Sequence, residues 1–147
     1  RGANCVRKTT KLWLLFTFFL ILALAVGCST YEKWTPDQVI NSFKTASLEA
    51  ENVKDMEKSD YGMAPMTAKS GKRFYIPSLG ENAGGRVLTF ESQDDLEKMK
   101  QFYVEAGKQS AMFFSWVFVK DNVLIQINGD LPEDKAKLYE AALNNIK

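Results

Sequence analysis

Apolar positions recur with a helical period in the segment that follows residue 34. Thr35 is a good N-cap, a proline suited to the first helical turn comes next, and Gln38 completes a capping box. The apolar stripe behind this cap consists of Val39, Ile40 and Phe43. The pattern predicts a helix that runs to about Leu48.

Four later segments have the composition of β-strands and come in two pairs: residues 72–77, 86–91, 113–120 and 123–128. A Gly-rich connection (78–85) joins the first pair, and Asp121-Asn122, whose residue types tolerate positive φ, joins the second. Helical spacing follows each pair, and the first of these helices has Ser92 as its N-cap and Gly107 as its C′ stop. The chain is therefore predicted to be α+β, with an N-terminal helix and two ββα units. These units form a four-stranded, mainly antiparallel sheet with helices packed on it.

The remaining segments are less regular. The last helix is expected to open near Pro132 and to place three apolar residues on one side: Leu138, Ala142 and Ile146. Residues 49–59 are strongly charged and ambiguous, and residues 61–70 are expected to form a loop. Residues 35–147 are predicted to form a single α+β domain, because a chain of this length supports one modest core.

A two-residue turn at Asp121-Asn122 would fix the register of the second hairpin. It pairs Phe118 with Ile125, Trp116 with Ile127 and Phe114 with Gly129, and this face is predicted to be core. The opposite face is half apolar and half amide or hydroxyl: Phe113, Ser115, Val117, Val119, Leu124, Gln126 and Asn128. We favour cover of this second face by the N-terminal helix, and the alternative is contact with a partner.

The start of the chain follows another pattern. Arg7, Lys8 and Lys11 precede residues 12–26, an uncharged run of 15 residues that is apolar except for one threonine. A basic flank, an apolar core of this length and small residues after it are typical of a secretory signal, so residues 1–27 are predicted to be a signal peptide.

Two alternatives bear on this leader. The basic stretch begins directly after Val6, whose codon can serve as a bacterial start, so residues 1–5 are expected to be upstream read-through. Residues 12–31 contain no charge and, at 20 positions, approach the ~20 needed to span a bilayer, so an uncleaved anchor is the competing reading. In both cases the basic flank stays in the cytoplasm and the domain lies outside.

The residues at the end of the leader, Ala25-Val26-Gly27-Cys28, resemble the lipobox of bacterial lipoproteins. The resemblance implies that the Cys28 thiol receives a diacylglyceryl group and that cleavage falls between Gly27 and Cys28. Residues 28–34 would then be a lipidated tether that holds the domain to the extracytoplasmic face of the cell membrane, as two acyl chains do stably.

Composition narrows the function classes. Residues 1–27 hold four of the 19 basic residues and none of the 18 acidic ones, so residues 28–147 have a net charge of −3. This charge gives no electrostatic case for nucleic acid as a partner. Cys28 is the last cysteine and the chain has no histidine, which removes disulfides from the domain together with the commonest general base and zinc ligand.

One stretch combines unusual backbone residues with a cation. Residues 77–85 contain three glycines and a proline, and Arg86 follows them as a candidate anion donor. The interpretation that we favour is a long hairpin loop beside an exposed surface arginine, and an anion site at Arg86 is the alternative. The candidate ligand or partner contacts are four residues: Arg86, and Ser115, Gln126 and Asn128 of the second hairpin face. Of the three carboxylate pairs, Asp94-Asp95 and Glu133-Asp134 lie in first turns of predicted helices, where acids interact favourably with the helix dipole. We predict no catalytic residue, metal or cofactor.

Three stretches, Pro77-Ser78-Leu79-Gly80, Phe114-Ser115-Trp116 and Gln126-Ile127-Asn128-Gly129, resemble those of small uncharacterised surface lipoproteins of Gram-positive bacteria, some labelled stress proteins. The expected function is a non-enzymatic, membrane-anchored binding or interaction module of the cell envelope. Its partner would be an envelope protein, a wall component or a small ligand. The alternatives are a cell-wall-active enzyme that uses carboxylates with Arg86, and an exclusion or immunity factor of a mobile element.

Overall fold

The computed structural model describes Tyr31 and residues 33–147, which form an α+β domain around a five-stranded sheet. The predicted signal peptide, Gly27 and Cys28 lie outside the described residues. The helices are α2 (Pro36–Thr45), α3 (Lys58–Tyr61), α4 (Gln93–Gln109) and α5 (Glu133–Asn144), with 3-10 turns η1 (Pro77–Leu79) and η2 (Ala111–Phe113). The strands are β1 (Glu51–Asp55), β2 (Ser70–Tyr75), β3 (Gly84–Thr89), β4 (Ser115–Lys120) and β5 (Val123–Asn128).

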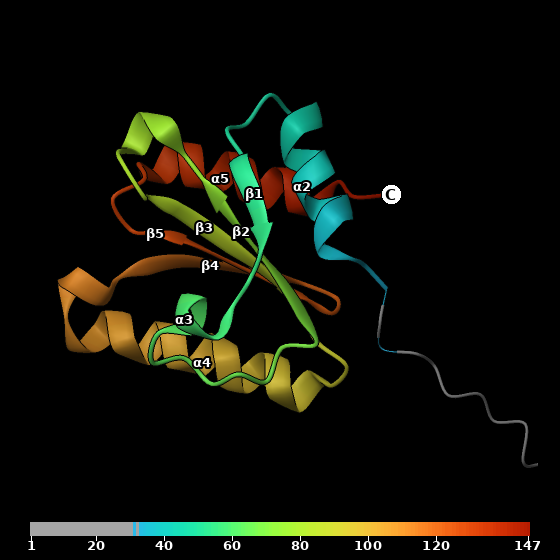
Figure 1. Cartoon of the computed structure of the whole chain (residues 1–147), viewed down its shortest axis with the longest axis vertical. Helices are drawn as coiled ribbons and strands as arrows, with labels where there is room; N and C mark the ends of the chain where they lie inside the picture. The colour runs from blue at the N-terminus through green and yellow to red at the C-terminus, as the bar shows by residue number, and fades with distance from the viewer. Residues whose placement is uncertain (1–30, 32) are drawn as a thin grey trace, which may run out of the picture.

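The strand order is β1-β2-β3-β5-β4, and every neighbouring pair is antiparallel. Because β5 lies between β3 and β4, those two strands run parallel, and the connection between them needs a crossover. The 17-residue helix α4 makes this crossover and fills one face of the sheet. α2 and α5 lie on the other face (Figure 1).

The prediction of four strands was wrong, because the charged segment 49–59 supplies a fifth strand, β1. Most of its residues are solvent-exposed, so the strand carries no apolar alternation from which it is recognisable. β1 is a strand because its backbone pairs with β2. A bulge between Glu51 and Lys54, with Asn52 at φ +47°, bends this edge of the sheet.

The two sheet faces hold separate apolar clusters. On the first face, Phe43 of α2 packs against Phe74 and against Tyr139 of α5, with ring centroids 5.5 and 5.0 Å away. On the second face, α4 buries Leu96 and Met99 over the sheet. Helical cover of the second hairpin face is thus present, but by α4. Its assignment to the N-terminal helix was wrong, because α2 completes the aromatic cluster with α5 on the opposite side.

The predicted register of the second hairpin is confirmed, with Phe118 opposite Ile125 and Trp116 opposite Ile127. Asp121 has the positive φ (+50°) that its turn position requires. The third predicted pair, Phe114 with Gly129, is not part of the ladder, since β4 begins at Ser115. Phe114 ends the η2 turn and is 44% exposed, so its assignment to the core was wrong.

Three helix predictions need correction. α2 ends at Thr45, before Leu48, because Ser47 takes a left-handed φ of +57°. α4 continues past Gly107 to Gln109; that glycine serves close packing, since a Cβ there would lie 3.3 Å from Phe114 Cα. In the last helix, Leu138 was wrongly assigned to the buried side, since it is 54% exposed. Ala142 is buried and Ile146, just beyond α5, packs partly buried against the core, as predicted; the other buried residues of α5 are Ala136, Tyr139 and Leu143.

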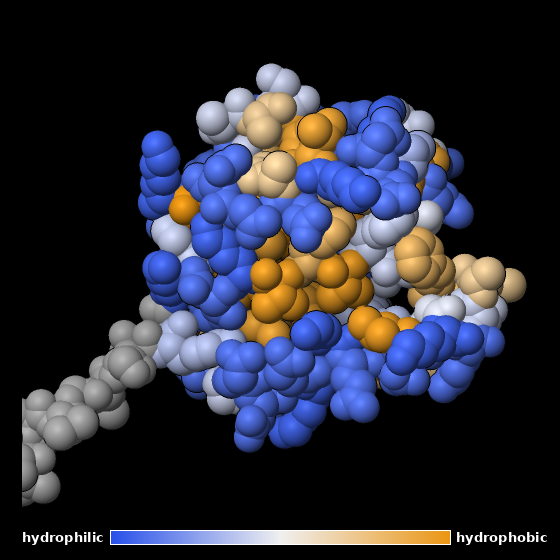
Figure 2. Space-filling model, turned by 180° about the vertical axis from the view of Figure 1, so that it is seen from behind, coloured by the Kyte–Doolittle hydropathy of each residue, from blue (hydrophilic) through white to orange (hydrophobic). Residues whose placement is uncertain are grey.

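The two edges of the sheet differ in character. β1 is bulged and mostly charged, whereas the residues of β4 are all half-buried and include Val117, Phe118 and Val119. Seen from behind, apolar side chains gather at the centre of the molecule between two polar regions (Figure 2). Among the described residues, no helix combines the length and apolar character that crossing a bilayer requires.

Candidate functional site

A cavity of about 500 Å³ opens at one end of the sheet, between the C-terminal half of α4, η2 and the adjoining ends of β3, β4 and β5. All four residues predicted as ligand contacts line it: Arg86, Ser115, Gln126 and Asn128. They come from three strands and meet because they share the α4 face of the sheet at neighbouring register positions.

A row of directly opposed residues crosses the sheet at the cavity, and three of its members line it: Arg73, Arg86 and Gln126. Lys54 pairs with Arg73, Arg73 with Arg86, and Arg86 with Gln126 across four successive strands. Three cations in adjacent cross-strand positions repel one another. The sheet therefore concentrates positive charge at one place, although residues 28–147 are net acidic.

One buried carboxylate partly neutralises this row. Asp60 of α3 is 6% exposed, and its Oδ1 accepts from Arg73 Nη1 at 3.2 Å and lies 3.6 Å from Lys54 Nζ. The hydrogen bond from the Glu57 backbone N–H lowers the pKa of Asp60, and Lys54 and Arg73 shift it in the same direction. Asp60 is therefore ionised at neutral pH and offsets one of the three positive charges.

Arg86 has neutral partners. Its Nε donates to the Asp60 carbonyl oxygen at 2.8 Å, and its Nη1 donates to Gln126 Oε1 at 2.6 Å. A guanidinium has five N–H donors, so three remain on the Nη1 and Nη2 side. The side chain is half-buried, so the favoured interpretation of Arg86 as an exposed surface arginine was wrong. No ion pair forms at Arg86 within the described part of the chain.

Two hydroxyl groups among the lining residues are buried without a hydrogen-bond partner: Tyr103 Oη and Ser115 Oγ. Burial raises the pKa of the Tyr103 hydroxyl, and the positive charge of Arg86 opposes that shift. Buried polar groups are usually paired, so two unpaired hydroxyls beside one cavity mark a place where donors and acceptors are held ready. Asn128 is partly committed, since its Oδ1 accepts from the Asp130 backbone N–H at 2.8 Å.

The rim of the cavity is apolar and exposed. Met112 is 85% exposed, Met63 78%, Phe113 50% and Phe114 44%. Single exposed apolar residues are ordinary on a surface, but four around one opening form a patch, and such patches mark binding sites. The cavity therefore combines a cationic, hydroxyl-bearing floor with an apolar mouth.

Glycines make room for this arrangement. A Cβ on Gly84 would collide with the Phe74 carbonyl oxygen, and one on Gly129 would collide with the Phe114 carbonyl oxygen. Gly84 therefore lets β2 approach β3 closely two residues before Arg86, and Gly129 lets the Phe114 backbone, which follows η2, approach the end of β5. The glycines singled out in the sequence stretch 77–85 thus have a packing role next to the predicted cation.

The cavity is poor in acids. Asp130 is the single carboxylate among the described residues that line it, and no described group of three or more acids and cysteines is placed to hold a metal ion. Paired carboxylates with raised pKa are the arrangement that glycoside hydrolysis uses. The described acids with shifted pKa values, Glu49, Asp60, Asp95 and Asp121, are all shifted downward.

Sequence reasoning missed Arg73, Tyr103 and the methionine and phenylalanine residues of the rim. Arg73 lies directly opposite Arg86 on the neighbouring strand. Aligning the two predicted strands of the first hairpin would therefore have placed both arginines on one face of the sheet. No local pattern distinguishes Tyr103 from the other apolar positions of α4, because its partner elements are distant in sequence.

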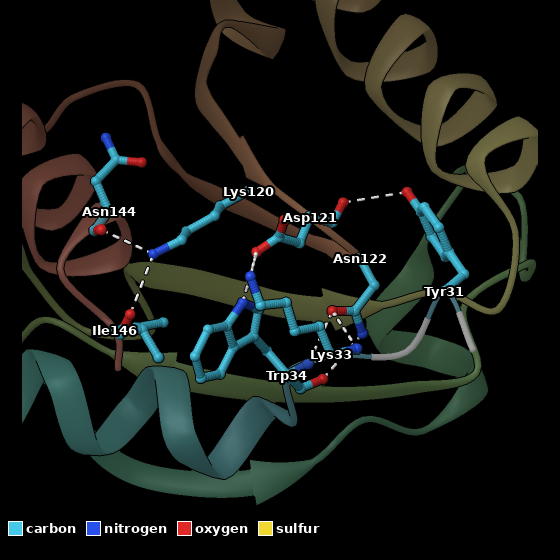
Figure 3. Close-up of polar contacts among 8 residues, drawn as sticks. All are labelled: Tyr31, Lys33, Trp34, Lys120, Asp121, Asn122, Asn144 and Ile146. Atoms are coloured by element: carbon cyan, nitrogen blue, oxygen red, sulfur yellow. Dashed lines mark hydrogen bonds and ion pairs between the residues drawn. The ribbon is translucent and has the colours of Figure 1, made fainter. Parts of the chain in front are cut away.

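A second polar cluster lies at the opposite end of the sheet, where Tyr31, Lys33 and Trp34, from the segment predicted to be a tether, contact the turn of the β4–β5 hairpin (Figure 3). Asn122, 1% exposed, accepts from the backbone N–H groups of Lys33 and Trp34 and donates to the Trp34 carbonyl oxygen. Trp34 Nε1 donates to Asp121 Oδ2 at 2.7 Å, and Tyr31 Oη donates to the Asp121 carbonyl oxygen. We call these five residues the tether clasp.

A search of protein-family models, curated proteins and solved structures finds no match to this chain. The resemblance to small Gram-positive surface lipoproteins stays a prediction, and the geometry described above carries the functional argument.

Proposed function

We propose that this protein is a lipid-anchored binding module on the extracytoplasmic face of a bacterial cell membrane, and that its cavity holds a small ligand without chemical conversion. The observation that carries the binding role is the half-buried Arg86, which has neutral partners and donors to spare at the floor of a cavity. A partly buried charge is stabilised by a counter-charge, and a ligand would supply it.

The position of the clasp supports the anchoring role. Asp121 and Asn122 lie where β4 ends and β5 begins, whereas the cavity lies where β4 begins and β5 ends. Six residues of strand span about 20 Å, so Asp121 and the cavity lie at opposite ends of these two strands. Figure 1 shows β4 and β5 side by side along this length. A domain held by its tether would present this cavity away from the membrane.

The tether is also short. Two residues lie between position 28 and Tyr31, and the three Cα–Cα steps reach at most about 10 Å. If Cys28 carries the lipid, the clasp lies within that distance of the bilayer surface. The clasp would then restrict how the domain turns relative to the membrane.

Membrane fractionation tests the anchor. We expect the wild-type protein in the membrane fraction with a diacylglyceryl mass on an N-terminal Cys28, and Cys28→Ala protein in the soluble extracytoplasmic fraction or retained with its leader. Wild-type protein recovered with residues 1–27 attached and an unmodified thiol would refute the lipoprotein assignment.

Native mass spectrometry of the same membrane extract tests the binding role. We expect a non-covalent adduct on wild-type protein that is absent from an Arg86→Met variant. An adduct of equal occupancy on both proteins would place the ligand elsewhere.

A further inference from the structure

We propose that the ligand of this cavity is a small amphipathic carboxylate, whose head group binds Arg86 and whose apolar body lies against the rim formed by Met112, Phe113 and Phe114. This inference rests on the proposed binding function and narrows it to a ligand class. Charge, hydrogen-bond geometry and the apolar mouth each support it independently.

Charge decides the sign of the head group. Lys54, Arg73 and Arg86 stand in one cross-strand row, and Asp60 is the carboxylate that contacts this row. Asp130 adds one acid at the lining, but it is exposed to solvent. An anion that enters the cavity gains attraction from an arginine that lacks a carboxylate partner, whereas a cation is repelled.

Geometry favours a carboxylate. Nε and one N–H of Nη1 are occupied by Asp60 and Gln126, so one N–H of Nη1 and both N–H groups of Nη2 remain for a ligand. Two parallel N–H groups match the two oxygens of a carboxylate. The unpaired hydroxyls of Ser115 and Tyr103 are further donors in the same lining.

The apolar rim of the cavity indicates what the ligand carries besides its head group. A head group alone would leave Met112 and Phe113, 85% and 50% exposed, without a role, and a cavity of about 500 Å³ exceeds what one carboxylate fills. Apolar side chains around a polar floor are the usual composition of a small-molecule site. An acyl or aryl tail that extends from the head group past η2 would cover them.

Isothermal titration of the purified protein with four probes tests the proposal: octanoate, octyl phosphate, 1-octanol and acetate. We expect octanoate to bind at least about tenfold more tightly than 1-octanol, since a charge-assisted pair contributes roughly that much. Acetate should also bind at least about tenfold more weakly than octanoate, because it lacks the apolar tail. Octyl phosphate separates the head groups, and tighter binding of it than of octanoate would overturn the carboxylate assignment.

Two variants assign the contacts. Arg86→Met should weaken octanoate at least about tenfold and leave 1-octanol unchanged. The double variant Met112→Ser/Phe113→Ser, at exposed positions where folding is little affected, should weaken octanoate and leave acetate unchanged. Lys137→Met, an exposed cation on α5 at the other face of the sheet, is the matched control and should change nothing.

The outcomes separate this proposal from the broader one. Equal affinity for octanoate and 1-octanol, or an unchanged Arg86→Met variant, overturns the ligand class. If no probe binds while membrane-extracted protein carries an Arg86-dependent adduct of other chemistry, the ligand class is wrong and the binding role stands. If neither a probe nor an adduct binds, both are wrong.

Discussion

The polar groups at the two ends of the sheet differ in how far they are paired. At the clasp, each polar group of Asn122 that faces the tether has a partner, and the Asp121 carboxylate accepts from Trp34 and pairs with Lys33 at 3.2 Å. At the cavity, Arg86 has no carboxylate partner in the described chain and the hydroxyls of Tyr103 and Ser115 have no partner.

This difference separates groups that stabilise the fold from groups that cost stability. A buried hydrogen-bonded network such as the clasp holds one arrangement, and removal of one member leaves the others unsatisfied. Unpaired groups beside a cavity lower stability, and a protein that keeps them gains something other than stability from them. The contrast predicts that substitutions at the two ends change stability with opposite sign.

The largest effect is expected at Asn122. Asn122→Ala removes three hydrogen bonds to the backbone of Lys33 and Trp34 and should lower the free energy of unfolding by about 3 kcal/mol. Urea denaturation measures this change. A loss below about 1 kcal/mol would show that the clasp contributes little to the fold.

The opposite sign is expected at the cavity floor. The double variant Arg86→Met/Gln126→Met replaces a half-buried charge and its amide partner with apolar chains of similar volume. It should raise the free energy of unfolding by about 1–2 kcal/mol in the same urea experiment, as apolar replacement of buried polar pairs often does. A loss of stability of that size would mean that Arg86 is a structural residue.

A matched pair of tyrosines sharpens the comparison. Tyr103→Phe removes a buried hydroxyl without a partner and should stabilise the protein by about 1 kcal/mol. Tyr139→Phe removes a hydroxyl that donates to the Glu49 carbonyl oxygen at 2.8 Å and should destabilise it by a similar amount. Thermal unfolding of both variants at one pH provides the test, and shifts of the same sign would contradict it.

The smallest effect concerns acid pH at the clasp. The hydrogen bond from the Trp34 indole, assisted by Lys33, lowers the pKa of Asp121 below its usual 3.8. A depressed pKa in the folded state means that this contribution is complete above about pH 3.8 and is lost as the pH falls through the lowered value.

Since Asp121 is 36% exposed, solvent screens the interaction, and it should be worth about 0.5 kcal/mol. Stability of wild-type and Asp121→Asn protein, measured from pH 7 to pH 2, reports it. Asparagine tolerates the positive φ at this turn, so the two curves should converge at low pH. Curves that stay parallel would refute the assignment.

Local signals were sufficient for much of the fold. The cap at Ser92, the tight turn at Asp121 and the register of the hairpin that it joins all follow from residues close in sequence, and each is present in the structure. β1 was not predictable in this way, because its exposed residues carry no alternation and a partner strand distant in sequence creates it.

The candidate site shows the same limit. Arg86, Ser115, Gln126 and Asn128 were recognisable as polar residues on strands, yet their common position depends on β5 lying between β3 and β4. Strand order is a property of the whole chain, so the sequence could nominate these residues without showing that they surround one cavity.

The unequal edges of the sheet also set how copies of this domain meet each other. β4 keeps backbone N–H and C=O groups directed outward between apolar side chains, whereas β1 is bent and charged. If two copies pair along their β4 edges, each copy has used its apolar edge and presents only the bulged, charged β1 edge to a third molecule. Pairing of two copies along β4 would therefore stop at a twofold dimer, because the bulged and charged β1 at the other edge is unfavourable for a further addition.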